Sequence, residues 1–357
     1  MKESSRQWHI DALKMLASQL IVLHHLCAYG PLSEVMAQAM PALVNWLYED
    51  ARMAVQVFLV IGGYLAAASL APESRLWQRS VLSVMVRRYR RLVLPCLLAL
   101  LLAVLSAAVA RQWLFDDFVP AQPTLGQALS HLVLMQGLFN QEALSAGVWY
   151  VAIDFQLFLI MTLLMWLGQR RHRTGGHPAP FGPGVAQTLV LGLMAASLFV
   201  FNRDDSWDNW GLYFFGAYGL GAAAYWSGSA RRPAWYLLAL LCLGLLALSL
   251  DFRERIALAL STAMLLGLWQ MQTLQGRWQS LHGPARVRRW VMHMGRVSYA
   301  LFLLHFPVLM LGNALFVWAG FSSPLAAALT MLGCWACSLV LATAFEHWVE
   351  SPLSKLK

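Results

Sequence analysis

Long apolar stretches recur along this chain of 357 residues, and short arginine-rich breaks separate them. Residues 92–110 and 235–250, for example, contain no charged side chain. A helix of about 20 apolar residues is long enough to cross the hydrocarbon core of a bilayer. Only 12% of the residues are charged and 59% are hydrophobic, which excludes an ordinary soluble domain. The pattern predicts an all-α fold, a polytopic transmembrane helix bundle.

Apolar windows of membrane length predict about ten spans. They are expected near residues 10–29, 51–70, 92–112, 148–168, 184–202, 209–227, 235–250, 255–273, 297–319 and 324–348. The first window carries ionisable side chains and lacks a small-x-small cleavage site, so we expect a retained span rather than a signal peptide. Residues 1–357 are therefore predicted to form a single integral membrane domain with no appended soluble domain.

The lysine and arginine side chains predict the orientation of the spans. With the N-terminus inside, twenty of the 26 lie in inner segments and five in outer segments. Because cytoplasmic loops are enriched in these residues, both termini are predicted to be cytoplasmic. The net charge of +9 is thus a topology signal, and no nucleic acid is expected as a partner. Among the outer segments, 113–147 is long, and its apolar run 132–139 is expected to be an interfacial or re-entrant piece.

All five cysteines fall inside predicted spans. Cys334 and Cys337 form a C-x-x-C, but neither a histidine-rich segment nor a βαβ pattern accompanies them. We interpret the cysteines as packing residues, and neither a metal site nor a disulfide framework is expected.

A few ionisable residues lie inside predicted spans, where each costs roughly 2.5–3.5 kcal/mol on insertion scales and therefore needs a partner or a purpose. They are Asp11, Lys14, His24 and His25 in the first span, Asp154 in the fourth, His305 in the ninth, and Glu346 and Glu350 at the end of the tenth. For His24, His305 and Asp154 the favoured interpretation is packing, in a polar cavity or against a backbone carbonyl.

Helix geometry compares the candidates by face and depth. Lys14 and His25 share a face to within roughly 20° and lie about 16 Å apart along the axis. His25 is expected about 22 Å from the cytoplasmic edge, and Asp154 about 9 Å below the outer edge, which are similar depths. A neutral imidazole can act as a general base, and a carboxylate can hold its tautomer. His25 and Asp154 are therefore a candidate catalytic pair; the alternative is that both only face a polar cavity.

Four arginines occur within five positions, 87–91, directly before an apolar span and Pro95. A guanidinium fork matches the oxygens of a phosphate, so this run could clamp a phosphorylated ligand. The positive-inside rule and anionic lipid headgroups would demand the same residues, and from the residues alone this topological interpretation is the favoured one.

Six segments together resemble the acyltransferase type 3 family of bacterial integral membrane proteins, and the resemblance covers most of the chain. The first span resembles the motif D-x-L-R-x-x-A followed by a histidine, with Lys14 in place of the usual arginine. Residues 55–65 are similar to the segment V-F-F-x-x-S-G-Y-L, with Gly62 where serine is usual. The motif R-x-x-R and its following proline are matched by Arg88, Arg91 and Pro95.

Three further segments complete the resemblance. Residues 149–156 resemble the tryptophan-containing acidic segment of the family, and they place Asp154 where glutamate is common. Residues 298–307 are similar to S-Y-x-x-x-L-x-H-x-P and contain His305. Residues 350–352 match the terminal E-x-P.

The resemblance implies an O-acyltransferase of the bacterial cytoplasmic (inner) membrane. Its expected donor substrate is an acyl-CoA, acetyl-CoA above all, docked from the cytoplasm on Arg88 and Arg91 with Lys14 assisting. Its expected acceptor is a hydroxyl of a glycan or exopolysaccharide, with His25 as the base and Asp154 as its orienting residue. No permanently bound cofactor is expected, and polysaccharide synthesis or export proteins are the expected protein partners. The alternative function is a transporter or flippase of glycan or lipid-linked intermediates.

Overall fold

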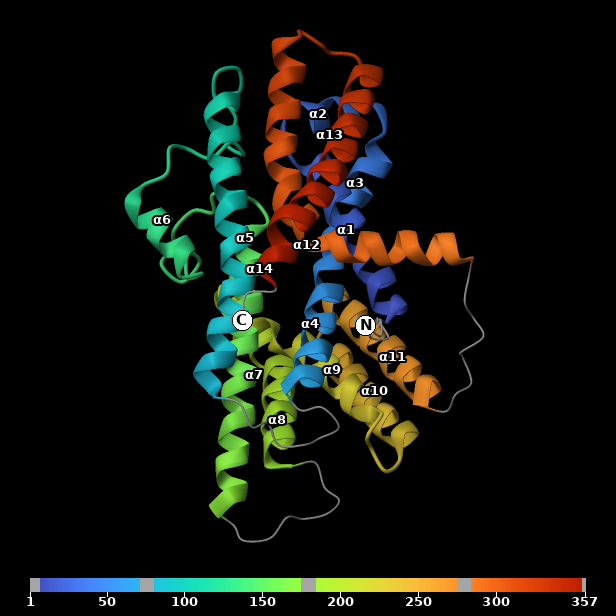
Figure 1. Ribbon diagram of the computed structural model, residues 1–357. Coiled ribbons are helices and arrows are strands. Elements are labelled where there is room, and N and C mark those ends of the chain that lie inside the picture. The colour runs from blue at the N-terminus through green and yellow to red at the C-terminus, as the bar shows by residue number, and fades with distance from the viewer. Residues whose placement is uncertain (1–6, 71–79, 175–183, 275–283, 355–357) are drawn as a thin grey trace. The chain divides into compact units, whose positions relative to one another are not determined.

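The computed structural model describes residues 7–70, 80–174, 184–274 and 284–354, and every regular element in that part of the chain is helical (Figure 1). Eight of the described helical segments are long and apolar enough to cross a membrane. They are Trp8–Ala28, Pro41–Leu70, Val81–Ala110, Val148–Gly168, Val185–Arg203, Pro233–Leu250, Ala285–Trp318 and Pro324–Leu353. The predicted all-α membrane bundle is confirmed, and the protein is a multi-pass membrane protein.

Each of the ten predicted spans coincides with a helix. Two of them, 209–227 and 255–273, correspond to α9 (Gly211–Ser227) and α11 (Glu254–Leu274), which are not among the eight. The count of ten and the cytoplasmic side of both termini stay predictions, as does the organisation of residues 1–357 as one domain.

The chain divides into two compact units. Unit 1 comprises Met1–Val55, Arg90–Ala152 and Pro284–Lys357, and unit 2 comprises Gln56–Tyr89 and Ile153–Gly283. Two long helices, α5 (Val81–Ala110) and α7 (Val148–Thr174), contribute residues to both units.

In unit 1, helix α1 (Trp8–Ala28) packs along α12 (Ala285–Trp318), which in turn packs against α13 (Pro324–Phe345). Gly295 of α12 lies directly against Asp11 of α1, and a Cβ atom at this glycine would come within 2.5 Å of the Asp11 Cβ. Small residues at helix crossings allow such close approach inside membranes. The chain then continues beyond α13 through a π-helical turn, Glu346–Glu350, and a short helix α14 (Ser351–Leu353).

A sharp turn joins α1 to the two short helices α2 (Gly30–Ala39) and α3 (Pro41–Glu49). Gly30 has a φ of +77°, a conformation that glycine adopts without steric cost. The buried side chain of Asn313 from α12 accepts a hydrogen bond of 3.0 Å from the Leu32 backbone N–H. The turn is thereby fixed to the core of unit 1.

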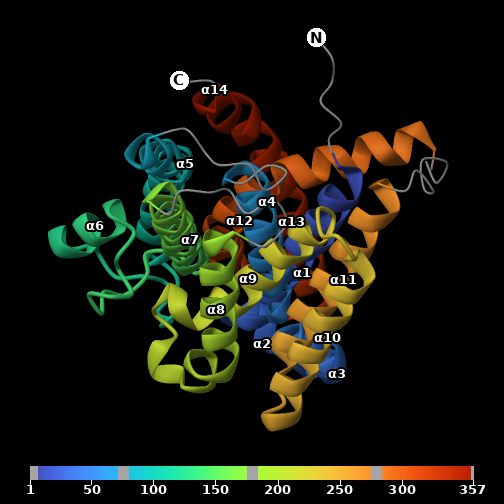
Figure 2. The same cartoon turned by 90° about the horizontal axis from the view of Figure 1, so that it is seen from below.

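In unit 2, helix α9 packs against both α8 (Val185–Phe199) and α11, as Figure 2 shows. Residues of α4 (Val55–Leu70) approach α9 closely, because Gly63 lies against the Tyr218 carbonyl and Gly221 against the Val60 carbonyl. The remaining helix of unit 2, α10 (Pro233–Leu250), packs against α11.

The long connection 113–147 contains one helix, α6 (Leu125–Leu132). Thr124 and Gln127 form a capping box at its start. The apolar run 132–139, predicted to be interfacial or re-entrant, is not a helix, because α6 ends at Leu132 and turns follow. Leu134 and Asn140 adopt positive φ values of 57° and 51° within these turns.

Candidate active site

The most distinctive polar contact in unit 1 joins two histidines 280 residues apart. His25, in the last turn of α1, is 8% exposed, and His305 of α12 is 2% exposed. His305 Nε2 lies 2.8 Å from His25 Nδ1, and His305 Nδ1 lies 3.0 Å from the carbonyl oxygen of Leu301. The packing of α1 along α12 therefore brings the predicted base against a second imidazole.

The Leu301 carbonyl determines which nitrogens carry protons in this chain of contacts. A carbonyl oxygen only accepts hydrogen bonds, so His305 Nδ1 must donate to it. In a neutral ring, His305 Nε2 is then an acceptor, and His25 Nδ1 must donate to it. The Nε2 atom of His25 is left unprotonated, with a lone pair that can take a proton.

Aromatic rings fix the orientation of the His25 ring. Tyr29 stacks on it with ring centroids 5.5 Å apart and an interplanar angle of 13°. Tyr29 is itself held edge-on by Phe306, at 5.4 Å. His24 lies 4.9 Å from His25, centroid to centroid, but its Nδ1 donates to the Leu47 carbonyl. His24 thus has the backbone partner that a packing role requires.

Two side chains of α12 position the segment that carries His305. Ser298 Oγ donates to the Gly295 carbonyl, and Tyr299 donates to the carbonyl of Leu92 in α5 at 2.9 Å. Both residues belong to the segment 298–307. Pro307 lacks an N–H, so it cannot donate to the Leu303 carbonyl one helical turn earlier.

The remaining predicted residue of α1, Lys14, is half-buried, and the neighbouring Asp11 is buried. Both make polar contacts within the structure. The predicted role of Lys14 beside a donor phosphate stays a prediction.

In unit 2, two of the predicted site residues form an ion pair with each other. Arg88 Nη2 of α5 lies 2.5 Å from Asp154 Oδ2 of α7. The Asp154 side chain is 8% exposed and the Arg88 side chain 26%, and the guanidinium also lies over the Phe158 ring, 5.1 Å from its centroid. A buried carboxylate needs a cation or hydrogen bonds to offset its desolvation, and Arg88 supplies both.

The sequence predicted other partners for Arg88 and Asp154, namely a donor phosphate for Arg88 and His25 for Asp154. Asp154 belongs to unit 2 and His25 to unit 1, and each contacts a partner in its own unit, Arg88 and His305 respectively. Arg91 belongs to unit 1, is exposed, and lies close enough to Glu350 for their charges to interact. Each arginine of the R-x-x-R motif therefore has an acidic neighbour. The pairing of His25 with Asp154 and the phosphate clamp stay predictions.

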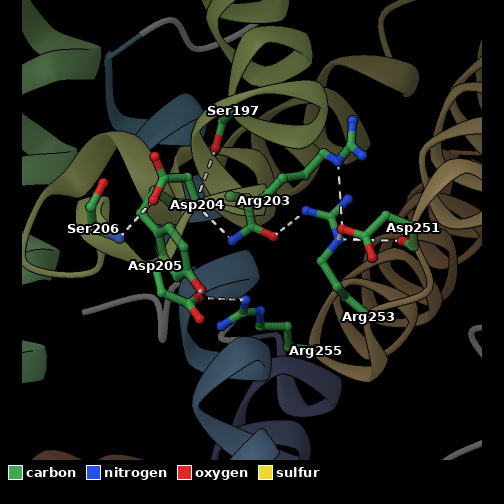
Figure 3. Close-up of polar contacts among 10 residues, drawn as sticks. Ser197, Arg203, Asp204, Asp205, Ser206, Asp251, Arg253 and Arg255 are labelled. Carbon is green, nitrogen blue, oxygen red and sulfur yellow. Dashed lines mark hydrogen bonds and ion pairs between the residues drawn. The ribbon is translucent and has the colours of Figure 1, made fainter.

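A second polar cluster in unit 2, which the sequence did not predict, is drawn in Figure 3. The guanidinium of Arg253, 9% exposed, donates to Asn202 Oδ1 at 2.6 Å and to the Leu198 carbonyl at 3.0 Å. Burial lowers the pKa of Arg253, and the Asp251 carboxylate opposes that shift. Arg253 thereby joins the chain after α10 to the end of α8.

The exposed part of the same cluster centres on Asp205. The hydroxyl of Tyr213 donates to its Oδ1 at 2.7 Å, and Arg255 Nη2 lies 3.4 Å from the same atom. These contacts, the tyrosine hydrogen bond first, lower the pKa of Asp205. The members of this cluster are bonded mainly to one another. We therefore interpret it as a structural contact that joins the start of α9 to the start of α11.

The described residues contain no group of three or more His, Cys, Asp or Glu side chains that could hold a metal ion. Cys334 is buried and Cys337 is exposed, and both are free thiols.

Comparison with known families gives a match over residues 8–343 to a model described as an acyltransferase domain. The match covers nearly the whole chain. It includes both members of the His25–His305 pair and both members of the Arg88–Asp154 pair. No curated protein and no solved structure matches the chain.

Proposed function

Because the chain belongs to the acyltransferase type 3 family, we propose that it moves an acyl group from an acyl-CoA to a hydroxyl of a glycan. Family membership and the multi-pass helical architecture support a membrane acyltransferase. The proposed donor is acetyl-CoA, and the proposed acceptor is a glycan or exopolysaccharide at or beyond the outer half of the membrane. The proposed location is the bacterial cytoplasmic membrane, where polysaccharide synthesis or export proteins are the proposed partners.

The proposed base is His25, and the observation that carries this role is its contact with His305. The lone pair on His25 Nε2 takes the proton of the acceptor hydroxyl. The hydroxyl oxygen attacks the carbonyl carbon of the thioester, the new C–O bond forms, and the C–S bond breaks. The proton then leaves His25 for the departing thiolate, so the products are an ester and free CoA.

His305 acts in this proposal as a positioning residue. Its Nε2 accepts from His25 Nδ1 at 2.8 Å, which holds the His25 ring in the tautomer with an unprotonated Nε2. Once His25 is protonated, the same contact stabilises the imidazolium. A carboxylate in this place would stabilise the imidazolium more strongly, but it would also bring a permanent charge into a membrane-embedded core. A neutral imidazole avoids that cost in the resting state.

The donor is proposed to dock from the cytoplasmic side on Arg88 and Arg91, with Lys14 assisting. Phosphate oxygens are good partners for the guanidinium fork. Because Asp154 occupies Arg88 and the charge of Glu350 acts on Arg91, a bound phosphate would compete with these carboxylates or share the arginines with them. Donor affinity in this proposal therefore depends on the acidic neighbours as well as on the arginines.

The proposal is tested by mixing purified protein with acetyl-CoA and glycan, then measuring released CoA thiol and the mass of the glycan. The expected result is thiol release that requires the glycan, with a matching gain of acetyl mass on the glycan. The His25→Ala variant should lose both while it still inserts and purifies like the parent. Movement of glycan across a sealed vesicle without any thiol release would contradict the proposal and favour a transporter.

A further inference from the structure

Helix α6 in unit 1 has its apolar side chains on the outside and its polar side chains on the inside. Leu125, Leu129 and Leu132 are 77%, 53% and 39% exposed, and the following Val133 is 43% exposed. In contrast, Ser130 and His131 of the same helix are 4% and 1% exposed. This arrangement is the reverse of a helix that covers the core of a soluble protein.

The inward polar groups of α6 are bonded to the protein, so their burial is accounted for. His131 Nδ1 donates to the Gln127 carbonyl at 2.8 Å, and its Nε2 accepts from the Leu144 N–H at 3.2 Å. Ser130 Oγ donates to the Gln127 carbonyl, and the Gln127 amide donates to the Glu142 carbonyl at 2.9 Å. These hydrogen bonds fix the orientation of the helix, and they hold its apolar face outward.

The apolar face of α6, defined as Leu125, Leu129, Leu132 and Val133, is accompanied by exposed apolar side chains on α5. The membrane span of α5 exposes a row of side chains at helical spacing, namely Leu94, Leu98, Leu101, Leu105 and Val109. Beyond the end of α5, Trp113 and Phe115 are also exposed, the latter at 96%. An exposed apolar row on a membrane-spanning helix is the surface that meets lipid.

Charge is absent from the sequence around this face. Residues 118–141 contain no Asp, Glu, Lys or Arg, although the flanking positions Asp117 and Glu142 are acidic. A face that contacts water or the polar rim of a protein partner would normally carry charged side chains. The uncharged stretch fits a hydrocarbon environment instead.

We propose that the apolar face of α6 is a lipid-binding surface, inserted into one leaflet of the bilayer. A helix of eight residues is about 12 Å long and cannot cross the hydrocarbon core, so it lies along the leaflet. Interfacial helices of this kind bury their apolar face about 5–10 Å deep at the boundary between headgroups and acyl chains. The occupant of the face is lipid acyl chain.

This surface would link the lipid to the segment that leads into α7. His131 and Gln127 hold the backbone of Leu144 and Glu142, a few residues before α7 begins at Val148. A leaflet that holds α6 would therefore also fix this entry segment. The inference does not depend on the acyl transfer proposed above, because it concerns a surface and not a reaction.

The test uses nitroxide spin labels on single cysteines in protein reconstituted into nanodiscs of phosphatidylethanolamine and phosphatidylglycerol. Cys27, Cys242 and Cys337 are first replaced by serine, because they are free and not buried. Labels are then placed by Leu129→Cys on α6, by Leu98→Cys on α5 as the lipid-facing reference, and by Glu142→Cys as the water-facing reference. Collision with oxygen reports lipid, and collision with a water-soluble nickel chelate reports solvent.

The expected result is that the label at position 129 collides with oxygen and is protected from nickel to the same degree as the label at position 98. Nickel accessibility equal to that at position 142 would overturn the proposal. Protection from both reagents together with spin–spin broadening between copies would also overturn it, because a second copy of the chain would then cover the face. If Leu129→Cys fails to fold, Leu125→Cys tests the same face one helical turn earlier.

Discussion

The His25–His305 pair of unit 1 is neutral, whereas the Arg88–Asp154 pair of unit 2 is an ion pair. This difference in charge determines which of them can accept a proton. In unit 1, His25 and His305 join α1 to α12 through one hydrogen bond between rings that are neutral in the tautomers derived above. In unit 2, Arg88 and Asp154 join α5 to α7 through full and opposite charges. A neutral pair is cheap to bury and can accept a proton, whereas an ion pair already holds its charges in place.

The comparison predicts opposite effects when one partner is removed. Loss of one histidine leaves a neutral polar group, so the rate of acyl transfer should suffer more than folding. Loss of Arg88 or Asp154 leaves an uncompensated charge in a buried place, so folding itself suffers. Separate measurements of turnover and of thermal stability therefore distinguish the two pairs.

The largest expected effect is on turnover in the His25→Ala variant. Removal of a general base typically costs about 10²–10⁴-fold in rate. The variant should keep the melting temperature of the parent in detergent to within a few degrees. The reason is that the substitution removes a neutral side chain and leaves no buried charge without a partner. The measurement is CoA thiol release with acetyl-CoA and glycan at saturating concentration. Activity within tenfold of the parent would exclude His25 as the base.

The next effect is on stability, in the pair of unit 2. Arg88→Met leaves the Asp154 carboxylate without its cation, which should cost up to about 3 kcal/mol, below the value for a fully buried pair because Arg88 is partly exposed. The double variant Arg88→Met with Asp154→Leu should recover most of this loss. Thermal unfolding in detergent measures both.

Arg52→Met is the matched control for that experiment. It removes an exposed ion pair with Glu49, 3.0 Å long, and should change stability by no more than about 1 kcal/mol. Equal destabilisation by the single and double variants at positions 88 and 154 would show that the ion pair is not what matters there.

A smaller effect is expected from His305, and two substitutions sharpen it. His305→Phe fills the ring volume but offers His25 no acceptor, which should cost about 1–3 kcal/mol of transition-state stabilisation, roughly five- to 150-fold in rate. His305→Gln places an amide oxygen where Nε2 was, so it should retain most of the rate if His305 only holds the tautomer. Equal rates in the two variants would contradict a positioning role through this hydrogen bond.

The smallest effect concerns His131, a buried histidine whose two nitrogens are both occupied. Burial lowers its pKa below the ordinary value of 6.5, and the Gln127 carbonyl partly opposes this. Between that lowered pKa and about 6.5, His131 binds a proton when the contact between α6 and Leu144 opens, but not while this contact is closed. Protection of the Leu144 amide from hydrogen exchange should therefore fall as pH decreases from about 6.5 to the lowered pKa. Above about pH 6.5 this protection should be constant.

Hydrogen exchange at the Leu144 amide, which donates to His131, measures this protection. The His131→Gln variant should lose the pH dependence and keep full turnover at neutral pH, in contrast to His25→Ala. A protection factor at Leu144 that does not change with pH in the parent, after division by the intrinsic exchange rate at each pH, would contradict the assignment.

Much of the fold could be predicted from the sequence, because an apolar run of membrane length is a property of a single segment. All ten predicted spans are helices in the structure, including α9, whose 17 residues are just short of a typical span. The tertiary turns of 132–140 could not be predicted, since a positive φ at Leu134 depends on what surrounds that residue.

The candidate site shows where such reasoning stops. His25 stood out because an ionisable residue inside a span is costly, and helical periodicity gave its depth. Periodicity does not say which neighbouring helix a residue meets, and so His305, 280 positions away, was interpreted as packing although it lies in a family-like segment. For the same reason Asp154 was paired on depth alone, and its contact with Arg88 was not foreseen.

The central claim is that His25 holds an unprotonated Nε2 because His305 accepts from its Nδ1. Nitrogen NMR of protein labelled with ¹⁵N-histidine, with the His25 and His305 signals assigned by difference from the His25→Ala and His305→Gln variants, tests this directly. The account predicts at neutral pH that both rings are neutral and carry their proton on Nδ1. A His25 ring protonated on Nε2 would contradict it.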